Sequence, residues 1–230
     1  MCHAPCVQRS LIQLSLRFLG DLAYPPKCPL CDSFVQSRDS ACPQCEPYIQ
    51  RFRSDAHIEL PGRIWISYAR SCFAYDGRVR DALQAMKYSK RLDLARFFGR
   101  EMASEAREMG PFDLLACVPM ACARIRGRGY NPAALLSRAV AKSCGVPFAP
   151  GVLRRSRDAA PQVGLPREER VRNVVGAFEV SRAADARIDG ARVLLIDDVL
   201  TTGATANDCA RALSKAGADE ICVLTAARAL

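Results

Sequence analysis

The sequence predicts an α/β fold, with helices on both faces of a parallel sheet and a small metal-binding module near the start of the chain. Short apolar runs of strand length alternate with stretches in which apolar residues recur at helical spacing, the pattern of a parallel sheet covered by helices. Four cysteines in two closely spaced pairs predict the module. A chain of 230 residues has room for one domain of ordinary size and such an appendage, and we expect units at residues 1–50 and 51–230.

The first unit is expected to hold a zinc ion. It contains Cys28-x2-Cys31 and, ten residues on, Cys42-x2-Cys45. Each pair can wrap a tight turn that points both sulfurs the same way, and two such turns complete a tetrahedron of thiolates around Zn²⁺. The zinc would be structural, because four thiolates leave no position for a substrate. The alternatives are two disulfides, or cysteines that merely pack in a core.

No segment of the sequence predicts export or a membrane span. Residues 11–22 predict an amphipathic helix rather than the apolar core of a secretion signal, because Gln13, Arg17 and Asp21 interrupt the apolar residues. The longest nearly apolar stretch, residues 114–123, is shorter than the about 20 residues that cross a bilayer. We therefore expect a cytoplasmic protein, in a reducing compartment that favours zinc over disulfides for the 12 cysteines.

The chain is strongly basic. Its formal charge of +9, from 33 Lys and Arg against 24 Asp and Glu, would attract nucleic acid or a phosphate-rich substrate. Arginines cluster at Arg124, Arg126 and Arg128, and again within residues 154–173. For either cluster a solvated basic surface is the plain alternative.

The second unit opens with a strand and two helices. Residues 63–75 are mostly β-branched or aromatic and predict a strand, which an Asp-Gly turn ends. Apolar residues on one face predict a helix over residues 78–88. A second helix is expected over residues 92–109, where a Gly-Pro pair closes it.

The middle of this unit is expected to run strand, loop, helix, strand. The apolar run at residues 112–119 has the length of a strand, and a loop that holds residues 124–129 follows it. A helix is expected over residues 132–144, because Asn131 can cap it and a proline suits its first position. Residues 146–153 then predict a short strand.

The last part of the chain alternates in the same way. Residues 154–173 form a polar, arginine-rich connection, and a brief strand is expected at residues 177–180. Buried strands are expected at residues 192–196 and 220–225, with a helix over residues 205–216 between them. Strands that alternate with helices favour a parallel sheet.

Two carboxylates and a run of small residues follow the strand at residues 192–196. Ligands bind at the carboxyl ends of parallel strands, so Asp197 and Asp198 reach the edge of the sheet where a site is expected. Residues 201–205 then begin a helix, where unpaired backbone N–H groups and the helix dipole attract an anion. A sugar with a 5′-phosphate fits such donors, and the carboxylates suit hydroxyl groups or Mg²⁺. An ordinary strand-turn-helix connection with an acidic cap is the plain alternative.

The absence of two other motifs narrows the class of phosphate-binding protein. An aliphatic strand that ends on an acid also occurs in P-loop nucleotide hydrolases. The chain has no G-x-x-x-x-G-K-[ST], and it has no G-x-G-x-x-G for a dinucleotide. The sequence therefore lacks the phosphate-binding loops of both P-loop nucleotide hydrolases and dinucleotide-binding proteins.

Residues 193–205, VLLIDDVLTTGAT, resemble the phosphoribosyl pyrophosphate (PRPP) signature of the type I phosphoribosyltransferases. The chain as a whole resembles the ComF/GntX family, in which a four-cysteine zinc module precedes a phosphoribosyltransferase domain. The resemblance is carried by the signature, by the two cysteine pairs, by YDGRVRDALQAMKY at residues 75–88, by VPMACARIRGRGYNPAALL at residues 118–136 and by PQVGLPREERVRNVVGAF at residues 161–178.

The resemblance implies a site for PRPP and Mg²⁺. Asp197 and Asp198 would be the catalytic acids and would hold the ribose hydroxyls, directly or through Mg²⁺. Residues 154–173 correspond to a loop that closes over the site. The pyrophosphate would be neutralised by Arg124, Arg126 or Arg128, and the 5′-phosphate cradled by Thr201, Thr202, Gly203, Ala204 and Thr205.

Two functions follow from the resemblance. The first is a Mg²⁺-dependent phosphoribosyltransferase of unknown acceptor with a ComF-type role in DNA uptake, although no base-binding segment is recognisable after the last strand. The second is a non-catalytic accessory protein that binds single-stranded DNA or a helicase-like partner in transformation and uses the pocket to sense PRPP. Few aromatic residues are evident for base stacking, which argues against direct DNA binding. Either protein could act as an oligomer.

Overall fold

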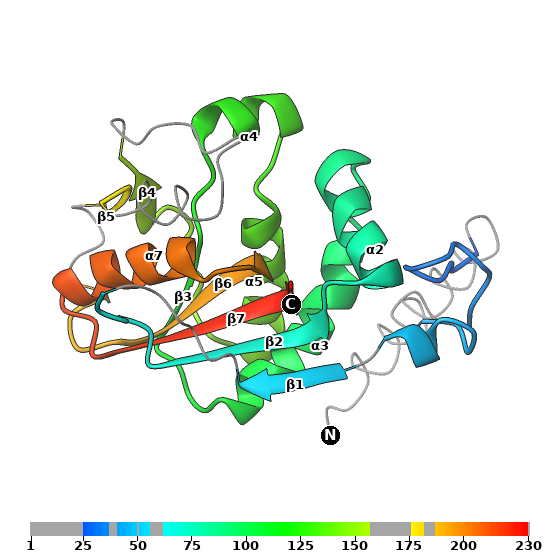
Figure 1. Cartoon of the computed structure of the whole chain (residues 1–230), viewed down its shortest axis with the longest axis horizontal. Helices are drawn as coiled ribbons and strands as arrows, with labels where there is room; N and C mark the ends of the chain where they lie inside the picture. The colour runs from blue at the N-terminus through cyan, green and yellow to red at the C-terminus, as the bar shows by residue number, and fades with distance from the viewer. Residues whose placement is uncertain are drawn as a thin grey trace, which may run out of the picture.

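A computed structural model of the chain describes residues 25–36, 41–49, 51–55, 62–156, 176–181 and 187–229 (Figure 1). The helix predicted over residues 11–22 lies outside the described residues. So do residues 157–173, most of the arginine-rich connection.

A five-stranded sheet forms the centre of the structure, with the strand order β1-β2-β7-β6-β3. β2, β7, β6 and β3 are parallel, whereas β1 at the edge is antiparallel to β2. The parallel strands confirm the predicted fold class. The strands are β1 (Arg51–Asp55), β2 (Tyr68–Ala74), β3 (Leu114–Cys117), β6 (Arg192–Leu200) and β7 (Glu220–Arg228).

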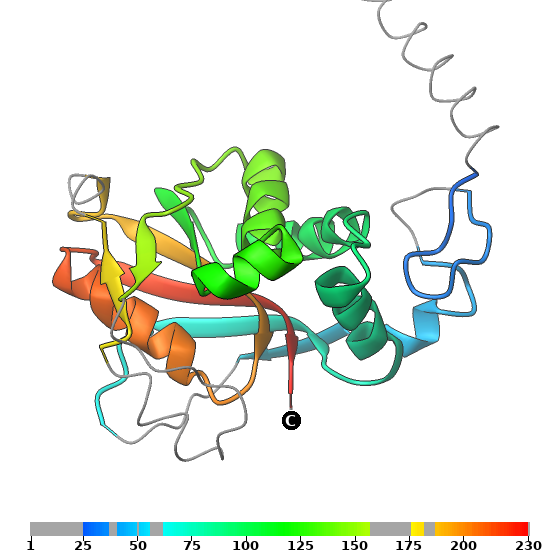
Figure 2. The same cartoon turned by 90° about the horizontal axis from the view of Figure 1, so that it is seen from above.

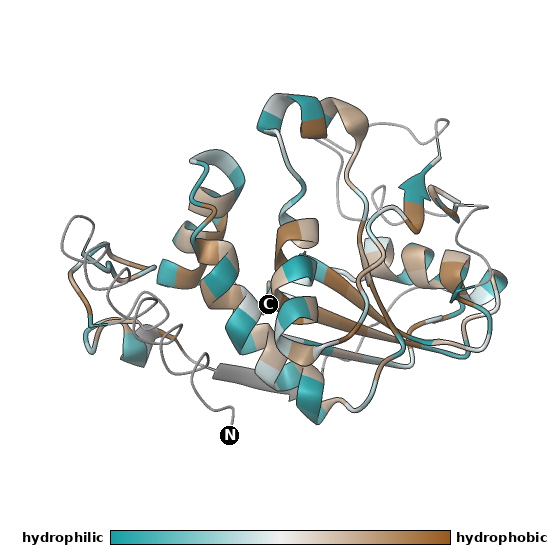
Figure 3. Cartoon of the chain, turned by 180° about the vertical axis from the view of Figure 1, so that it is seen from behind, coloured by the Kyte–Doolittle hydropathy of each residue, from teal (hydrophilic) through white to brown (hydrophobic). Residues whose placement is uncertain are grey.

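Helices cover both faces of the sheet (Figure 2). Strand residues alternate between two apolar clusters: Val193 and Leu195 pack on the side of α7, whereas Leu194 and Ile196 pack on the other side. Burial on both faces explains why these strands are continuous apolar runs in the sequence, as their colour shows (Figure 3). The helix on one face is α7 (Ala204–Lys215), and those on the other are α2 (Gly77–Tyr88), α3 (Leu94–Glu108) and α5 (Pro132–Cys144). No helix in the described ranges is long and apolar enough to cross a bilayer.

β6 is longer than predicted. It continues through Leu200 instead of ending at Ile196, because Asp197 pairs with Thr225 and the pairing runs on to the end of β7. The two acids therefore lie within the strand rather than after it.

Several elements were missed in the sequence, among them the short 3-10 helix η1 (Glu46–Tyr48). The loop expected to hold residues 124–129 is wrong, because Cys122–Arg128 form a short helix, α4, that ends at Gly129 with a φ of 88°. None of the residues of α4 is buried, so it lacks the apolar periodicity by which a helix is recognised. β1 has a polar sequence and was not predicted either.

Several predicted strands are shorter in the structure, and the one expected over residues 112–119 is limited to β3, Leu114–Cys117. The strand expected over residues 63–75 begins at Tyr68, because the amide of Trp65 instead donates to Oδ1 of Asn207 on α7 at 2.7 Å. The strand expected over residues 146–153 is reduced to an isolated bridge to β3.

A two-stranded ribbon packs against α7. It consists of β4 (Leu153–Arg155) and β5 (Phe178–Val180), which are antiparallel. Asp208 on α7 is buried and accepts from the amide of Phe178 at 3.1 Å and from Nε of Arg211 at 2.6 Å. These bonds fix the ribbon to the helix that begins at the predicted phosphate loop.

Candidate functional site

The four cysteines predicted as metal ligands lie together. The sulfurs of Cys28, Cys31, Cys42 and Cys45 are all within 4.8 Å of one another, and none of the four is in a disulfide. A tetrahedral zinc ion with Zn–S bonds of about 2.3 Å places its sulfurs about 3.8 Å apart. The sulfurs of Cys31 and Cys42 lie 3.6 Å apart. The donor set therefore fits a structural zinc ion.

Neighbouring groups form hydrogen bonds with this cluster. A guanidinium nitrogen of Arg78, in the first turn of α2, lies 2.7 Å from Sγ of Cys45. Hydrogen bonds with Ser33 lower the pKa of Cys31 to about 6. Burial beside the other sulfurs raises the pKa of Cys45, an effect that a bound metal cation reverses. Arg78 and Ser33 both favour the thiolate, which is the form that binds a metal.

The cysteine module, residues 25–36 and 41–49, packs against the start of α2 (Figure 1). Arg91, just after α2, forms an ion pair with Asp32 at 3.0 Å. Leu30 and Ile49 of the module contact the apolar cluster that α2 and α3 share. The module is therefore joined to the domain by charge and by apolar packing.

Asp197 and Asp198 lie side by side near the carboxyl end of β6. The amide of Asp198 donates to Oδ1 of Asp197 at 2.8 Å. Lys87, from the last turn of α2, places Nζ 3.0 Å from Oδ1 of Asp198, and the two side chains are 17% and 15% exposed. Burial and the charge of Asp198 raise the pKa of Asp197 to about 8, although Lys87 opposes the shift. Asp197 can therefore gain or lose a proton near neutral pH.

Lys87 was not among the predicted site residues. A single lysine in the last turn of a helix is common, because positive charge suits the helix dipole there. Only the fold brings it to Asp198, which lies far away in the sequence. One feature of the sequence could have identified Lys87 as a site residue: it lies within residues 75–88, a stretch that carries the family resemblance.

A cavity of about 230 Å³ opens beside the two carboxylates. Four cations and two acids stand around it. Burial and the nearby Arg124 lower the pKa of Arg155, so positive charge is crowded there. An anionic ligand with hydroxyl groups or a divalent cation fits such a lining. The predicted residues that line the cavity are Asp197, Asp198, Thr205, Arg124 and Arg128, and the structure adds Lys87 and Arg155.

Arg126 and residues 201–204 do not line this cavity in the described structure. Arg126 is exposed on α4, although it lies between two arginines that do reach the cavity. Of the predicted phosphate loop, the cavity includes Thr205 alone among the described residues.

The loop before α7 nevertheless keeps donors for an anion. Gly203 is buried and has a φ of 82°, in the left-handed region that favours glycine. The amide of Ala204 donates to Oγ1 of Thr202 at 3.3 Å. Within the described part of the chain, the amides of Gly203 and Thr205 donate to no protein acceptor. These two amides stand at the positive end of the α7 dipole.

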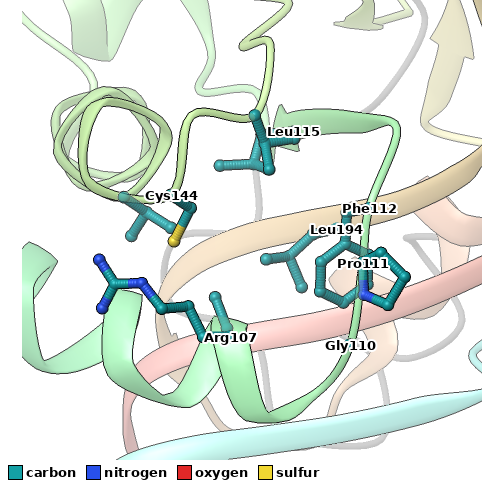
Figure 4. A pocket seen from close by; sticks show the side chains of 10 residues that line it. Arg107, Gly110, Pro111, Phe112, Leu115, Cys144 and Leu194 are labelled. Atoms are coloured by element: carbon teal, nitrogen blue, oxygen red, sulfur yellow. The ribbon is translucent and has the colours of Figure 1, made fainter.

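A second pocket, of about 260 Å³, lies between α3 and α5, beside the first halves of β3 and β6 (Figure 4). Its lining is apolar apart from Arg107, which donates to the carbonyl of Ser143 at 2.6 Å. Cys144 points its sulfur into the pocket, and burial raises the pKa of that thiol. No acidic residue is among the described residues that line this pocket.

The chain is similar to several known proteins. It is 36% identical to competence protein F of Haemophilus influenzae over 112 residues, which are 49% of this chain and 48% of that protein. It is 29% identical to the DNA utilization protein YhgH of Salmonella typhimurium over 217 residues, which are 88% and 90% of the two chains. Among solved structures, adenine phosphoribosyl transferase from Trypanosoma brucei is 16% identical, with a TM-score of 0.44 over 74% of each chain.

A family model described as the phosphoribosyl transferase domain matches residues 112–229, just over half of the chain. The match covers the strands β3, β6 and β7, both carboxylates and the loop before α7. The four-cysteine cluster lies ahead of it. The chain therefore belongs to the phosphoribosyl transferase domain family and, within it, is of the ComF/GntX type, in which a four-cysteine module precedes that domain.

Proposed function

We propose that the chain binds PRPP together with Mg²⁺ in the cavity beside Asp197 and Asp198, and that it is a phosphoribosyltransferase. One observation carries the proposal: a single cavity brings together the two acids, the start of α7 and several cations from α2, α4 and β4. PRPP offers matching groups, namely ribose hydroxyls, a 5′-phosphate and a pyrophosphate.

Each part of the site has a proposed role. Asp197 and Asp198 accept hydrogen bonds from the ribose hydroxyls, and their oxygens suit Mg²⁺, which binds through one or two carboxylates and substrate phosphates. The amides of residues 201–205 bind the 5′-phosphate. Arg124 and Arg128 neutralise the pyrophosphate. When bound, Mg²⁺ stabilises negative charge on the leaving pyrophosphate.

The physiological role is proposed from the relatives. Competence protein F and DNA utilization protein YhgH have names that refer to DNA uptake and use, and we infer a comparable role for this chain. We also propose that the protein is cytoplasmic, because a four-thiolate metal site is favoured in a reducing compartment.

Titration with PRPP in the presence of Mg²⁺ tests the proposal. We expect one PRPP per chain, and replacement of Arg124 by Ala is expected to weaken binding roughly tenfold, because a charge-assisted hydrogen bond to phosphate is lost. Arg126→Ala is the matched control, since Arg126 is on the same helix but lines no part of the cavity. Isothermal titration calorimetry gives both affinities. Absence of binding to zinc-loaded wild-type protein would refute the proposed function.

Binding of PRPP with Mg²⁺ is expected to strengthen as the pH rises toward about 8, the pKa of Asp197. Mg²⁺ requires the ionised carboxylate, whereas burial favours the protonated one in the empty site. Because folding raises the pKa of Asp197, this residue also affects stability. The free energy of unfolding of the ligand-free protein should fall as the pH rises from about 4, the pKa of Asp in the unfolded chain, to about 8, its pKa in the folded chain. Calorimetry in two buffers of different ionisation enthalpy measures the proton released. Asp197→Asn should remove this pH dependence, and an unchanged slope in the variant would contradict it.

A further inference from the structure

The pocket between α3 and α5 is separate from the carboxylate cavity. Its volume is about 260 Å³, and it shares no described lining residue with the cavity beside Asp197 and Asp198. Leu194 on β6 lines the pocket and precedes Asp197 by three positions, so roughly 10 Å of strand lies between the two residues. None of the roles proposed above uses this pocket.

The two helices are in tight contact before they reach the pocket. A Cβ added at Gly99 on α3 would collide with Cβ of Ala139 on α5, so the helix backbones approach closely there. Further along both helices, Sγ of Cys144 lies 3.5 Å from the carbonyl oxygen of Ala103. The pocket opens beyond these contacts, beside the last turns of α3 and α5. Its walls are therefore two helices that hold each other in place.

The floor of the pocket is apolar and buried. Leu115, Val140 and Leu194 are at most 1% exposed, and Phe112 lies opposite Cys144 (Figure 4). The described lining contains no hydroxyl group and no acidic residue. An apolar cavity of about 150 Å³ can bind benzene, so this pocket has room for an apolar group of that size or larger.

A single cation stands at the rim of the described lining. Arg107 is exposed, and one of its nitrogens donates to the carbonyl of Ser143 at 2.6 Å, which holds the guanidinium on the same side of the pocket as Cys144 (Figure 4). No ion pair joins Arg107 to a carboxylate within the described ranges. A guanidinium has five N–H donors, so donors remain for an anion at the mouth of the pocket.

The ends of the two helices are compatible with an anion, although helix C-termini carry partial negative charge. Arg107 donates to Ser143 near the end of α5. Arg192 donates to the carbonyls of Met109 and Pro111, which follow α3, at 3.1 and 3.0 Å. Guanidinium groups therefore offset the negative charge at the ends of both helices.

We infer that this pocket binds a small apolar molecule with a single carboxylate, such as a medium-chain fatty acid. The apolar part of the ligand packs on Leu115, Val140 and Leu194, and its carboxylate accepts hydrogen bonds from Arg107 at the rim. Burial keeps the Cys144 thiol protonated, so the ligand binds without a covalent bond. This site is independent of the proposed binding of PRPP, because the two spaces share no described residue.

Octanoate, octan-1-ol and acetate test the inference on the full zinc-loaded chain. The alcohol keeps the apolar chain without the charge, and acetate keeps the charge without the apolar chain. Titration followed by two-dimensional ¹H–¹⁵N NMR measures each affinity and identifies the amides that shift. We expect octanoate to shift the amides of Leu115, Val140 and Leu194. Octan-1-ol should bind about fivefold more weakly, since a solvent-exposed ion pair contributes little, and acetate should not bind.

Two outcomes of this titration would overturn the inference. If octanoate shifts none of the pocket amides, the pocket does not bind it. If octanoate and octan-1-ol bind equally well, the pocket does not recognise a carboxylate.

Replacement of Arg107 by Gln tests the role of the cation. Octanoate affinity should fall about fivefold and octan-1-ol affinity should stay unchanged. Arg100→Gln is the matched control, because Arg100 is an exposed arginine on the same helix that lines no part of the pocket. An equal loss in both variants would assign the effect to net charge and overturn the role of Arg107.

Replacement of Cys144 locates the ligand. Cys144→Phe fills the pocket and should abolish binding of octanoate and octan-1-ol, whereas Cys144→Ala leaves the pocket open and should keep both. Thermal unfolding shows whether each variant folds. Full binding by a folded Cys144→Phe variant would place the ligand outside this pocket and overturn the inference. Arg107→Gln changes an exposed side chain, so it tests the inference even if Cys144→Phe fails to fold.

Discussion

Exchanging Asp198 for Asn is expected to lower pyrophosphate release from PRPP by at least about a hundredfold. Asparagine keeps the shape of the side chain but removes the charge that attracts Mg²⁺ and accepts from the ribose hydroxyls. It also leaves Lys87 without its partner, which lies 3.0 Å away in the native chain. A largely buried lysine without a counterion repels further cations from the cavity. The measurement is pyrophosphate release by zinc-loaded protein with PRPP, Mg²⁺ and a panel of bases and amines.

Two further variants make this test specific. Asp219→Asn removes an exposed carboxylate outside the cavity and should keep wild-type activity. Lys87→Met in the Asp198→Asn background removes the unpaired charge, and activity should stay low because the acid itself is still missing. Undiminished release by Asp198→Asn would exclude this acid from the reaction. If a variant loses PRPP binding but cells that carry it still take up DNA normally, DNA uptake does not require the carboxylate cavity.

Replacing Cys28 with Ser is expected to release the metal and unfold the cysteine module. Little besides the metal holds this segment together, because its buried cluster consists of three cysteines with a few partly buried apolar neighbours. Binding of zinc to small modules contributes on the order of 10 kcal/mol to their folding. A serine oxygen is a poor replacement for a thiolate ligand. Elemental analysis should find one zinc per wild-type chain and none in the variant, with new proteolytic cuts within residues 25–49.

Cys122→Ser is the matched control for the metal site. Cys122 is an exposed free cysteine on α4, outside the four-sulfur cluster. This variant should keep its zinc and its resistance to proteolysis. Full zinc content in Cys28→Ser would show that the ion is bound elsewhere.

The sequence predicted the fold well wherever burial leaves a periodic pattern. β6 and β7 are apolar on both faces, and α5 carries its cap at Asn131, whose side chain accepts from the Ala133 amide at 3.1 Å. α4 has no buried residue and no side-chain cap, so neither signal was available. The continuation of β6 past Ile196 depends on its pairing with β7, which local sequence does not encode.

The sequence predicted only part of the candidate site, because only some of its residues are close together in the sequence. The acids and the start of α7 are adjacent in the sequence, so a local motif describes them. Lys87 reaches the same cavity from α2, and only the tertiary fold makes it a neighbour of Asp198. Arg155 of β4 also lines the cavity, and it belongs to the segment that the family resemblance places over the site.

α2 contacts both the cysteine cluster and the carboxylate pair. Its first turn places Arg78 against a sulfur of the cysteine cluster, and its last turn places Lys87 against Asp198. A helix of 12 residues is a stiff rod about 18 Å long, so a tilt at one end displaces the other. A displacement of Arg78 at the cysteine cluster would therefore also shift Lys87 relative to Asp198.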